Sequence, residues 1–217
     1  MKTNKTILAI VCSVALHLTT AAQWRAGIEQ YFYTHAPIAA AFVPMVHLQS
    51  PGNFYAELRY NYEDAKTLSL YAGKTFLGGN DLEYKITPMV GYSTGRFTGI
   101  SFAVNADVEW KNLFISSQTQ SGMSLRKNDT LSAKKNAGDF FYSWSELGYN
   151  LTDHFFGGVS VQDTRQTGGN IFETGILAGL RFKNLCFPFY VFNPFHQDRY
   201  FILGVNYEFS LKRKNER

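Results

Sequence analysis

The sequence predicts an all-β protein that folds as a closed antiparallel transmembrane β-barrel. First, apolar and polar residues alternate with period two along most of the chain after residue 22, as in strands with one apolar face. Second, many of the alternating segments reach the roughly 9 to 11 residues that a tilted membrane-spanning strand needs, and short connections alternate with longer ones. Third, the charged fraction of 18% is below the roughly 25% of soluble domains, whereas the chain holds 19 Phe and 13 Tyr.

The N-terminus has the composition of a secretory signal peptide. Lys2 and Lys5 precede the apolar run 7–18, and small residues occupy positions 19–22. The alternative, a membrane anchor, would need about 20 apolar residues, and this run is shorter. We therefore expect residues 1–22 to be removed. Without the two lysines the formal charge falls from +4 to +2, which leaves no basic footprint for nucleic acid. The two cysteines have no zinc-ligand spacing, so we expect no structural metal and no cofactor.

Eleven strands can be recognised directly from the alternation. In 54–63, for example, Phe54 and Leu58 share the apolar face while Glu57 and Arg59 share the polar one. The expected strands are 43–49, 54–64, 67–76, 82–94, 97–110, 113–123, 139–152, 154–165, 171–183, 185–193 and 199–210. A closed antiparallel barrel of this class needs an even number, and the segment Gly27–Thr34 supplies a twelfth strand. Ten strands, or a different register around Pro37, Pro44 and Pro51, is the alternative.

Aromatic residues gather near the strand ends, where interface girdles are expected. The girdle candidates are Tyr60, Tyr62, Phe76, Tyr84, Tyr92, Trp110, Phe155, Phe182, Tyr207 and Phe209.

The last strand carries an assembly signal. Leu203, Val205, Tyr207 and Phe209 alternate in L-G-V-N-Y-E-F, which resembles the final strand of Gram-negative outer-membrane barrels. In that class the assembly machinery recognises the terminal aromatic residue. Here a basic tail, residues 211–217, follows the barrel of 23–210, and we expect it in the periplasm.

Three internal motifs extend this resemblance over most of the chain after residue 22. R-Y-N-Y-E-D at 59–64, L-E-Y-K-I-T-P-M-V-G at 82–91 and F-Y-S-W-S-E-L at 141–147 are similar to motifs of a family of exported barrels without assigned activity. The resemblance implies residence in the outer membrane of a Gram-negative bacterium. Outer-membrane lipid, lipopolysaccharide, the barrel assembly machinery and periplasmic chaperones are then the expected partners, and no reaction is implied.

The charged residues expected inside the barrel are mostly acidic. The candidate lumen and selectivity residues are Glu57, Arg59, Glu63, Glu83, Lys85, Asp107, Glu109, Glu146, Glu173 and Arg181. With Glu208 the lumen would hold eight acids against three bases, and because unpaired buried charges are costly, we expect water to reach them.

Two interpretations of this lumen stay open. One is a narrow channel for passive passage of small polar or cationic solutes, in which acidic side chains set selectivity. The other is a closed structural or surface-binding barrel, plugged by Arg59, Lys85 and Arg181 paired with acids on neighbouring strands. Such a barrel would act through its outer loops, of which 124–139 is the longest.

Further side chains could bind ligands or support catalysis. Tyr142 and Trp144 could form a stacking platform for a flat ligand, or they could simply fill the lumen. Within 124–139, four basic residues could meet lipopolysaccharide phosphates, or be a solvated loop. They are Arg126, Lys127, Lys134 and Lys135. A lipid-directed hydrolase is the third possibility, with His47 paired to an acid such as Glu57, although no G-x-S-x-G spacing occurs after residue 22.

Overall fold

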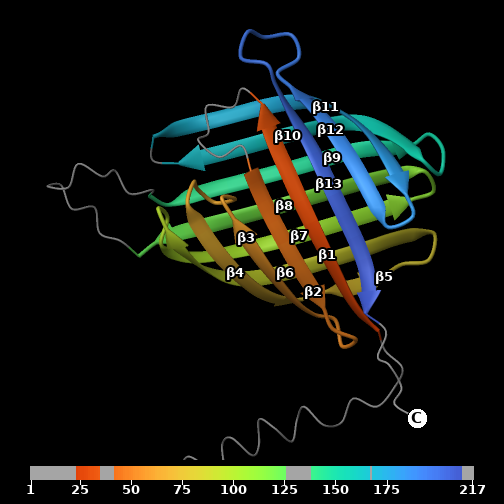
Figure 1. The fold of residues 1–217 in the computed structure, drawn as a ribbon, viewed down its shortest axis with the longest axis horizontal. Coiled ribbons are helices and arrows are strands. Elements are labelled where there is room, and N and C mark those ends of the chain that lie inside the picture. The colour runs from red at the N-terminus through yellow and green to blue at the C-terminus, as the bar shows by residue number, and fades with distance from the viewer. Residues whose placement is uncertain (1–22, 35–41, 126–137, 167, 212–217) are drawn as a thin grey trace, which may run out of the picture.

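The described residues form one closed antiparallel sheet. The computed structural model describes residues 23–34, 42–125, 138–166 and 168–211. Its thirteen strand segments follow one another around the sheet, with β1 beside β13, and the pairing of β4 with β6 closes it (Figure 1). Both β4 and β5 pair with β6, so they are one strand interrupted at Thr75. The barrel therefore has the predicted twelve strands, and the ten-stranded alternative is wrong.

The observed strand bounds agree with the expected ones to within a few residues. The segments are β1 (Trp24–Thr34), β2 (Phe42–Gln49), β3 (Phe54–Tyr60), β4 (Thr67–Lys74), β5 (Phe76–Gly78), β6 (Leu82–Gly95), β7 (Gly99–Trp110), β8 (Leu113–Ser124), β9 (Phe140–Asn150), β10 (Phe155–Gln166), β11 (Gly169–Phe182), β12 (Leu185–Phe192) and β13 (Tyr200–Leu211). Within the described residues, no helix is long and apolar enough to cross a membrane.

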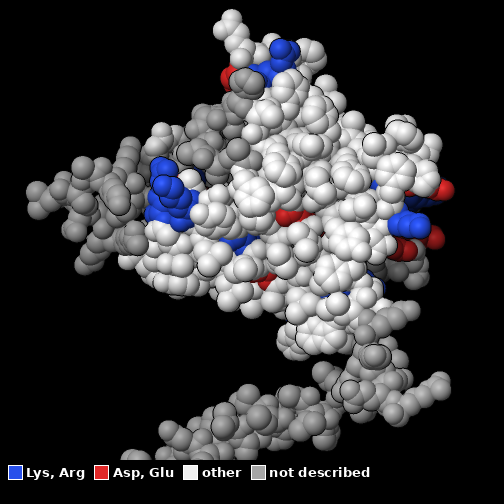
Figure 2. Space-filling model, viewed as in Figure 1, with Lys and Arg blue, Asp and Glu red and all other residues white. Residues whose placement is uncertain are grey.

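The outer wall is apolar and the interior is polar, the reverse of a water-soluble barrel. In β3, Phe54 is 64% and Leu58 44% exposed, whereas Glu57 and Arg59 are only 1% exposed. Figure 2 shows few charged side chains on the wall that faces the viewer and more of them toward its ends. An apolar outer wall with few charged side chains is the pattern of a barrel that stands in lipid.

The two ends of the barrel differ in their connections. At one end, here called the turn end, β1 begins, β13 ends and the connections are short, such as Lys111–Asn112 and Lys183–Asn184. Lys111 and Lys183 have φ values of 56° and 53°, the left-handed conformation that tight hairpins require. At the opposite end, here called the loop end, the connection between β8 and β9 lies largely outside the described residues, and so do its four basic residues.

The expected position of Tyr62 in an interface girdle is wrong. β3 ends at Tyr60 because Asn61 has a φ of 59°, and the period-two alternation stops there. The Asn61 side chain accepts a hydrogen bond from the Lys66 backbone at 2.6 Å, which holds this turn. The chain then directs Tyr62 into the lumen, where its hydroxyl donates to Gln118 across the barrel at 2.5 Å.

Candidate functional site: the barrel lumen

A buried charged network crosses the lumen from β3 to β8. The Arg59 guanidinium forms ion pairs with Glu57 on its own strand and with Glu63 in the turn that follows. It also donates a hydrogen bond to Gln120 on the far wall at 2.7 Å. The rings of Tyr62 and Tyr71 lie 4.5 and 4.4 Å from the guanidinium carbon. We call Glu57, Arg59, Glu63 and Gln120 the Arg59 layer.

The expectation that Arg59, Lys85 and Arg181 join acids on neighbouring strands is met only in part. Lys85 on β6 lies 3.9 Å from Asp107 on β7. Arg59 instead takes its acids from its own strand and the adjoining turn, because its side chain turns along β3 and over the lumen. Arg181 stands over the Phe156 ring at 5.3 Å, and the described residues show no ion pair for it.

Among the described residues, more of the interior carboxylates accept a hydrogen bond from a tyrosine hydroxyl than form an ion pair with Arg or Lys. Five acids each accept a hydrogen bond from a tyrosine at 2.7–3.0 Å. The pairs are Glu29 with Tyr31, Glu57 with Tyr55, Glu63 with Tyr71, Glu146 with Tyr190 and Glu173 with Tyr200. Hydrogen bonds to an ionised acceptor are about twice as strong as neutral ones. These hydrogen bonds stabilise interior carboxylates that have too few basic partners.

An aromatic cluster occupies the lumen beside β9. The Trp144 ring is 7% exposed and packs against Tyr190 at 4.9 Å, Phe192 at 5.8 Å and Tyr31 at 5.8 Å between ring centroids. Tyr142 meets Tyr62 edge-on at 5.9 Å. Both rings thus point inward as expected, and their packing is that of residues that fill the lumen.

A polar cavity of about 250 Å³ lies among these groups. Its lining includes four carboxylates, from Glu29, Asp107, Glu146 and Glu208, against one lysine, Lys85, together with the imidazole of His47. The Glu208 side chain is 58% exposed, so the lining reaches solvent at the turn end, close to where β13 ends. The space between Arg59, Tyr62, Gln118 and Gln120 holds no water-sized void. Between β3 and β8, the described side chains therefore leave no water-sized extension of the cavity past the Arg59 layer.

The remaining predicted lumen residues lie near the two ends. Glu83 and Glu109 face each other in the β6–β7 register and are exposed at the turn end. Glu173 accepts a second hydrogen bond from Asn193 at the loop end, at 3.1 Å. The assembly-signal residues lie along β13, with Leu203 and Tyr207 exposed on the outer wall.

The expected pair of His47 with Glu57 is wrong. His47 and Glu57 are register neighbours on β2 and β3, but the imidazole turns the other way and meets Glu208 at 2.8 Å and Glu29 at 3.7 Å. Sequence reasoning missed Glu29 as a site residue, although its place three residues inside an alternating segment was a usable signal. Among the described residues, the hydrogen-bond and ion-pair partners of His47 include no serine or threonine hydroxyl.

The fold and its lumen define a class of protein. No family model matches the chain, and no curated protein matches its sequence. Compared with solved structures, the chain has the fold of outer-membrane porins.

Particular porins show how far this likeness extends. The KdgM porin is 9% identical with a TM-score of 0.55, and the alignment covers 85% of this chain and 99% of that one. The KdgM porin in complex with disordered oligogalacturonate gives 7% identity, a TM-score of 0.52 and the same coverage. The NanC porin gives 6% identity and a TM-score of 0.49 over 87% of this chain and all of that one. At such identities the likeness is one of fold.

Proposed function

We propose that the protein is a narrow channel for passive passage of small polar solutes, with a preference for cations. The observation that carries the proposal is the polar cavity inside a closed barrel, where four carboxylates face one lysine. Acidic side chains in a confined, partly dehydrated space attract cations and oppose anions. The porin fold of the chain supports the same function.

The Arg59 layer is the constriction of this proposed route. It lies between the cavity and the loop end, and its side chains leave no water-sized void between β3 and β8. Passage then depends on movement of the side chains in this layer, so the conductance is small. Tyr62, which reaches Gln118 from the turn after β3, narrows the same level.

The charge of the lumen favours a different class of solute from the one bound in a structurally similar porin. One solved KdgM structure is a complex with oligogalacturonate, a sugar chain that carries carboxylates. The cavity here presents carboxylates of its own, which would repel such an anion. Inorganic cations and small amines or neutral polar solutes fit it better.

The proposal includes the cellular setting. Residues 1–22 direct export and are removed. The barrel of residues 23–210, whose last strand continues to Leu211, lies in the outer membrane, and the basic tail after it belongs to the periplasm, on the side of the turn end. The outward-facing aromatic residues of β13, including Tyr207, act as the signal for the assembly machinery. Lipid and lipopolysaccharide surround the apolar wall.

Single-channel recording in a planar bilayer tests the channel directly. The chain without residues 1–22 is refolded, its folding is verified by heat-modifiable electrophoretic mobility, and currents are recorded in asymmetric KCl. We expect small, stable conductance steps and a reversal potential on the cation-selective side. A reversal potential on the anion-selective side would contradict the charge argument.

One observation favours a second candidate, a closed barrel that does not conduct. Glu57, Arg59 and Glu63 are buried side chains held by mutual ion pairs, as in a plug. A folded barrel that never conducts, even when Arg59 is replaced by Ala, would support this candidate and exclude the channel.

A further inference from the structure

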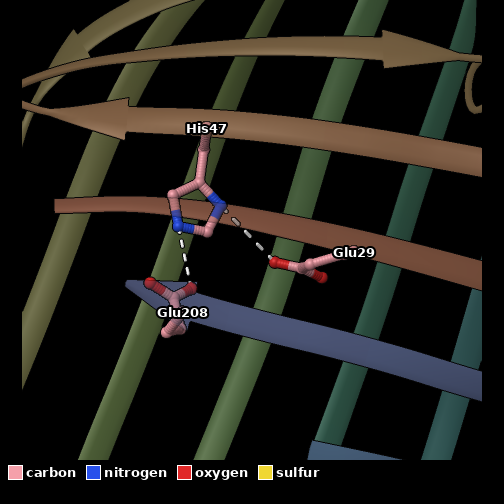
Figure 3. Close-up of side chains that lie close together, drawn as sticks. All are labelled: Glu29, His47 and Glu208. Carbon is pink, nitrogen blue, oxygen red and sulfur yellow. Dashed lines mark ion pairs between the residues drawn. The ribbon is translucent and has the colours of Figure 1, made fainter. Parts of the chain in front are cut away.

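Two carboxylates converge on one imidazole where β2, β1 and β13 run side by side. Figure 3 shows His47 between Glu29 and Glu208, with Nδ1 directed at Glu29 and Nε2 at Glu208. The Nε2–Oε1 distance to Glu208 is 2.8 Å and the Nδ1–Oε1 distance to Glu29 is 3.7 Å. One ligand atom from each residue lies within 4.8 Å of the other two.

Gly27 makes this convergence possible. In the sheet register His47 on β2 is opposite Gly27 on β1, and Gly27 is opposite Glu208 on β13. The imidazole crosses β1 over the glycine to reach the carboxylate. A Cβ at position 27 would lie 2.3 Å from Cε1 of His47 and 2.5 Å from Oε1 of Glu208, so any larger residue displaces the pair.

The Nδ1 atom of His47 is buried and has no hydrogen-bond partner among the described residues. The side chain is only 9% exposed, and its nearest charged neighbour on this side, Glu29, is too far for a hydrogen bond. The separation does suit joint coordination, because two ligands bound tetrahedrally at 2.0–2.1 Å lie about 3.4 Å apart. The other Glu29 oxygen accepts from Tyr31 at 3.0 Å, which orients the carboxylate.

We propose that this cluster binds a divalent transition-metal ion, with Zn²⁺ as the best match to its donors. His47 Nδ1 and the Glu29 carboxylate bind the ion, and water from the cavity completes its coordination. Imidazole with carboxylate suits zinc and its neighbours, whereas Mg²⁺ and Ca²⁺ prefer oxygen donors alone. Glu208 is a positioning residue that holds Nε2–H, the role a carboxylate takes behind many metal-bound histidines.

The site goes beyond the proposed function, because metal binding requires neither an open lumen nor solute passage. It lies on the lining of the same cavity, near its solvent-exposed edge at Glu208. A bound cation there would also neutralise part of the acidic cavity. The binding measurement therefore stands or falls independently of any conductance.

Equilibrium dialysis of the untagged, folded barrel against Zn²⁺, with the metal measured by atomic emission, tests the site. We expect about one ion per chain above that retained by a metal-free micelle control. His47→Gln and Glu29→Gln should each abolish this retention, and Glu208→Gln should weaken it by about 10- to 100-fold. His154→Gln is the matched control, because His154 is an exposed imidazole at the turn end.

Gly27→Ala adds a variant that changes no donor atom. The atoms its Cβ would meet are the ends of flexible side chains, so the barrel can fold while the imidazole is displaced. Folding of every variant is verified by heat-modifiable mobility, and loss of zinc in folded Gly27→Ala would support the site. The proposal is wrong if the wild type retains no more zinc than folded His47→Gln, or if His154→Gln loses as much.

Discussion

Replacing Arg59 by Met tests whether the lumen is closed by a buried ion-paired layer. Methionine is a flexible chain that fills similar space without the charge. The change removes the only cation that the described residues place against Glu57 and Glu63, two side chains with no exposed surface. It also removes the 2.7 Å hydrogen bond to Gln120.

The expected cost follows from that burial. Removing one partner of a buried ion pair typically costs about 3–5 kcal/mol, because the other charge stays buried and uncompensated. We expect Arg59→Met to lower the free energy of unfolding by that amount. With a urea slope of about 1–3 kcal/mol/M, the midpoint should fall by at least about 1 M. Replacing Glu57 and Glu63 by Gln in the same chain should restore most of the loss.

Urea unfolding in lipid vesicles, followed by tryptophan fluorescence, measures this change. Arg181→Met is the matched control, because Arg181 is exposed and the described residues show no ion pair for it. Its contacts with the Phe156 ring and the Cys186 side chain should be worth less than about 1 kcal/mol. If Arg59→Met loses less than about 1 kcal/mol while the transition stays cooperative, water reaches Glu57 and the layer is not a dry plug.

Three further predictions follow from the wall, the cavity and the proposed metal site. Leu70→Arg, on the outer wall at the middle of β4, should cost about 2–4 kcal/mol in vesicles, and a loss below about 0.5 kcal/mol would show that this face does not meet lipid. Replacing Asp107 and Glu146 by Asn and Gln should shift the reversal potential in asymmetric KCl toward zero; an unchanged value would remove these side chains from the conduction path. Micromolar Zn²⁺ on the turn-end side should reduce the conductance of the wild type and leave His47→Gln unaffected, and equal block of both would place any zinc effect elsewhere.

Most of the barrel could be predicted because its strands repeat one local rule. Phe54 and Leu58 face outward and Glu57 and Arg59 inward because successive side chains of a strand point to opposite faces. Tight turns such as Lys183–Asn184 fall where the alternation breaks. The requirement for an even number of strands predicted β1. The predicted position of Tyr62 was wrong because the left-handed conformation of Asn61 breaks the alternation, so the next side chain points into the lumen instead of outward.

The partners inside the lumen could not be predicted by the same rule. Alternation places Glu63, Tyr71 and Gln120 on the inner face but does not say which of them meet across it. Counting acids against bases overlooked tyrosine, a residue assigned to interfaces or to filling space, which turned out to be the main donor to interior carboxylates.

The sequence by itself determined the barrel class, the orientation of each face and the acidic character of the interior, because these depend on residue type and a period of two. It favoured twelve strands but left ten open until the pairing of the strands was known. Only the tertiary structure decided which strands pair to close the barrel and which side chains contact one another in the lumen. Closure sets β1 beside both β2 and β13, and this places Glu208 and Glu29, rather than the register neighbour Glu57, within reach of the His47 imidazole. That choice depends on the register of three strands and on the missing side chain of Gly27, since contacts between strands far apart in the chain are set by geometry that no local pattern contains.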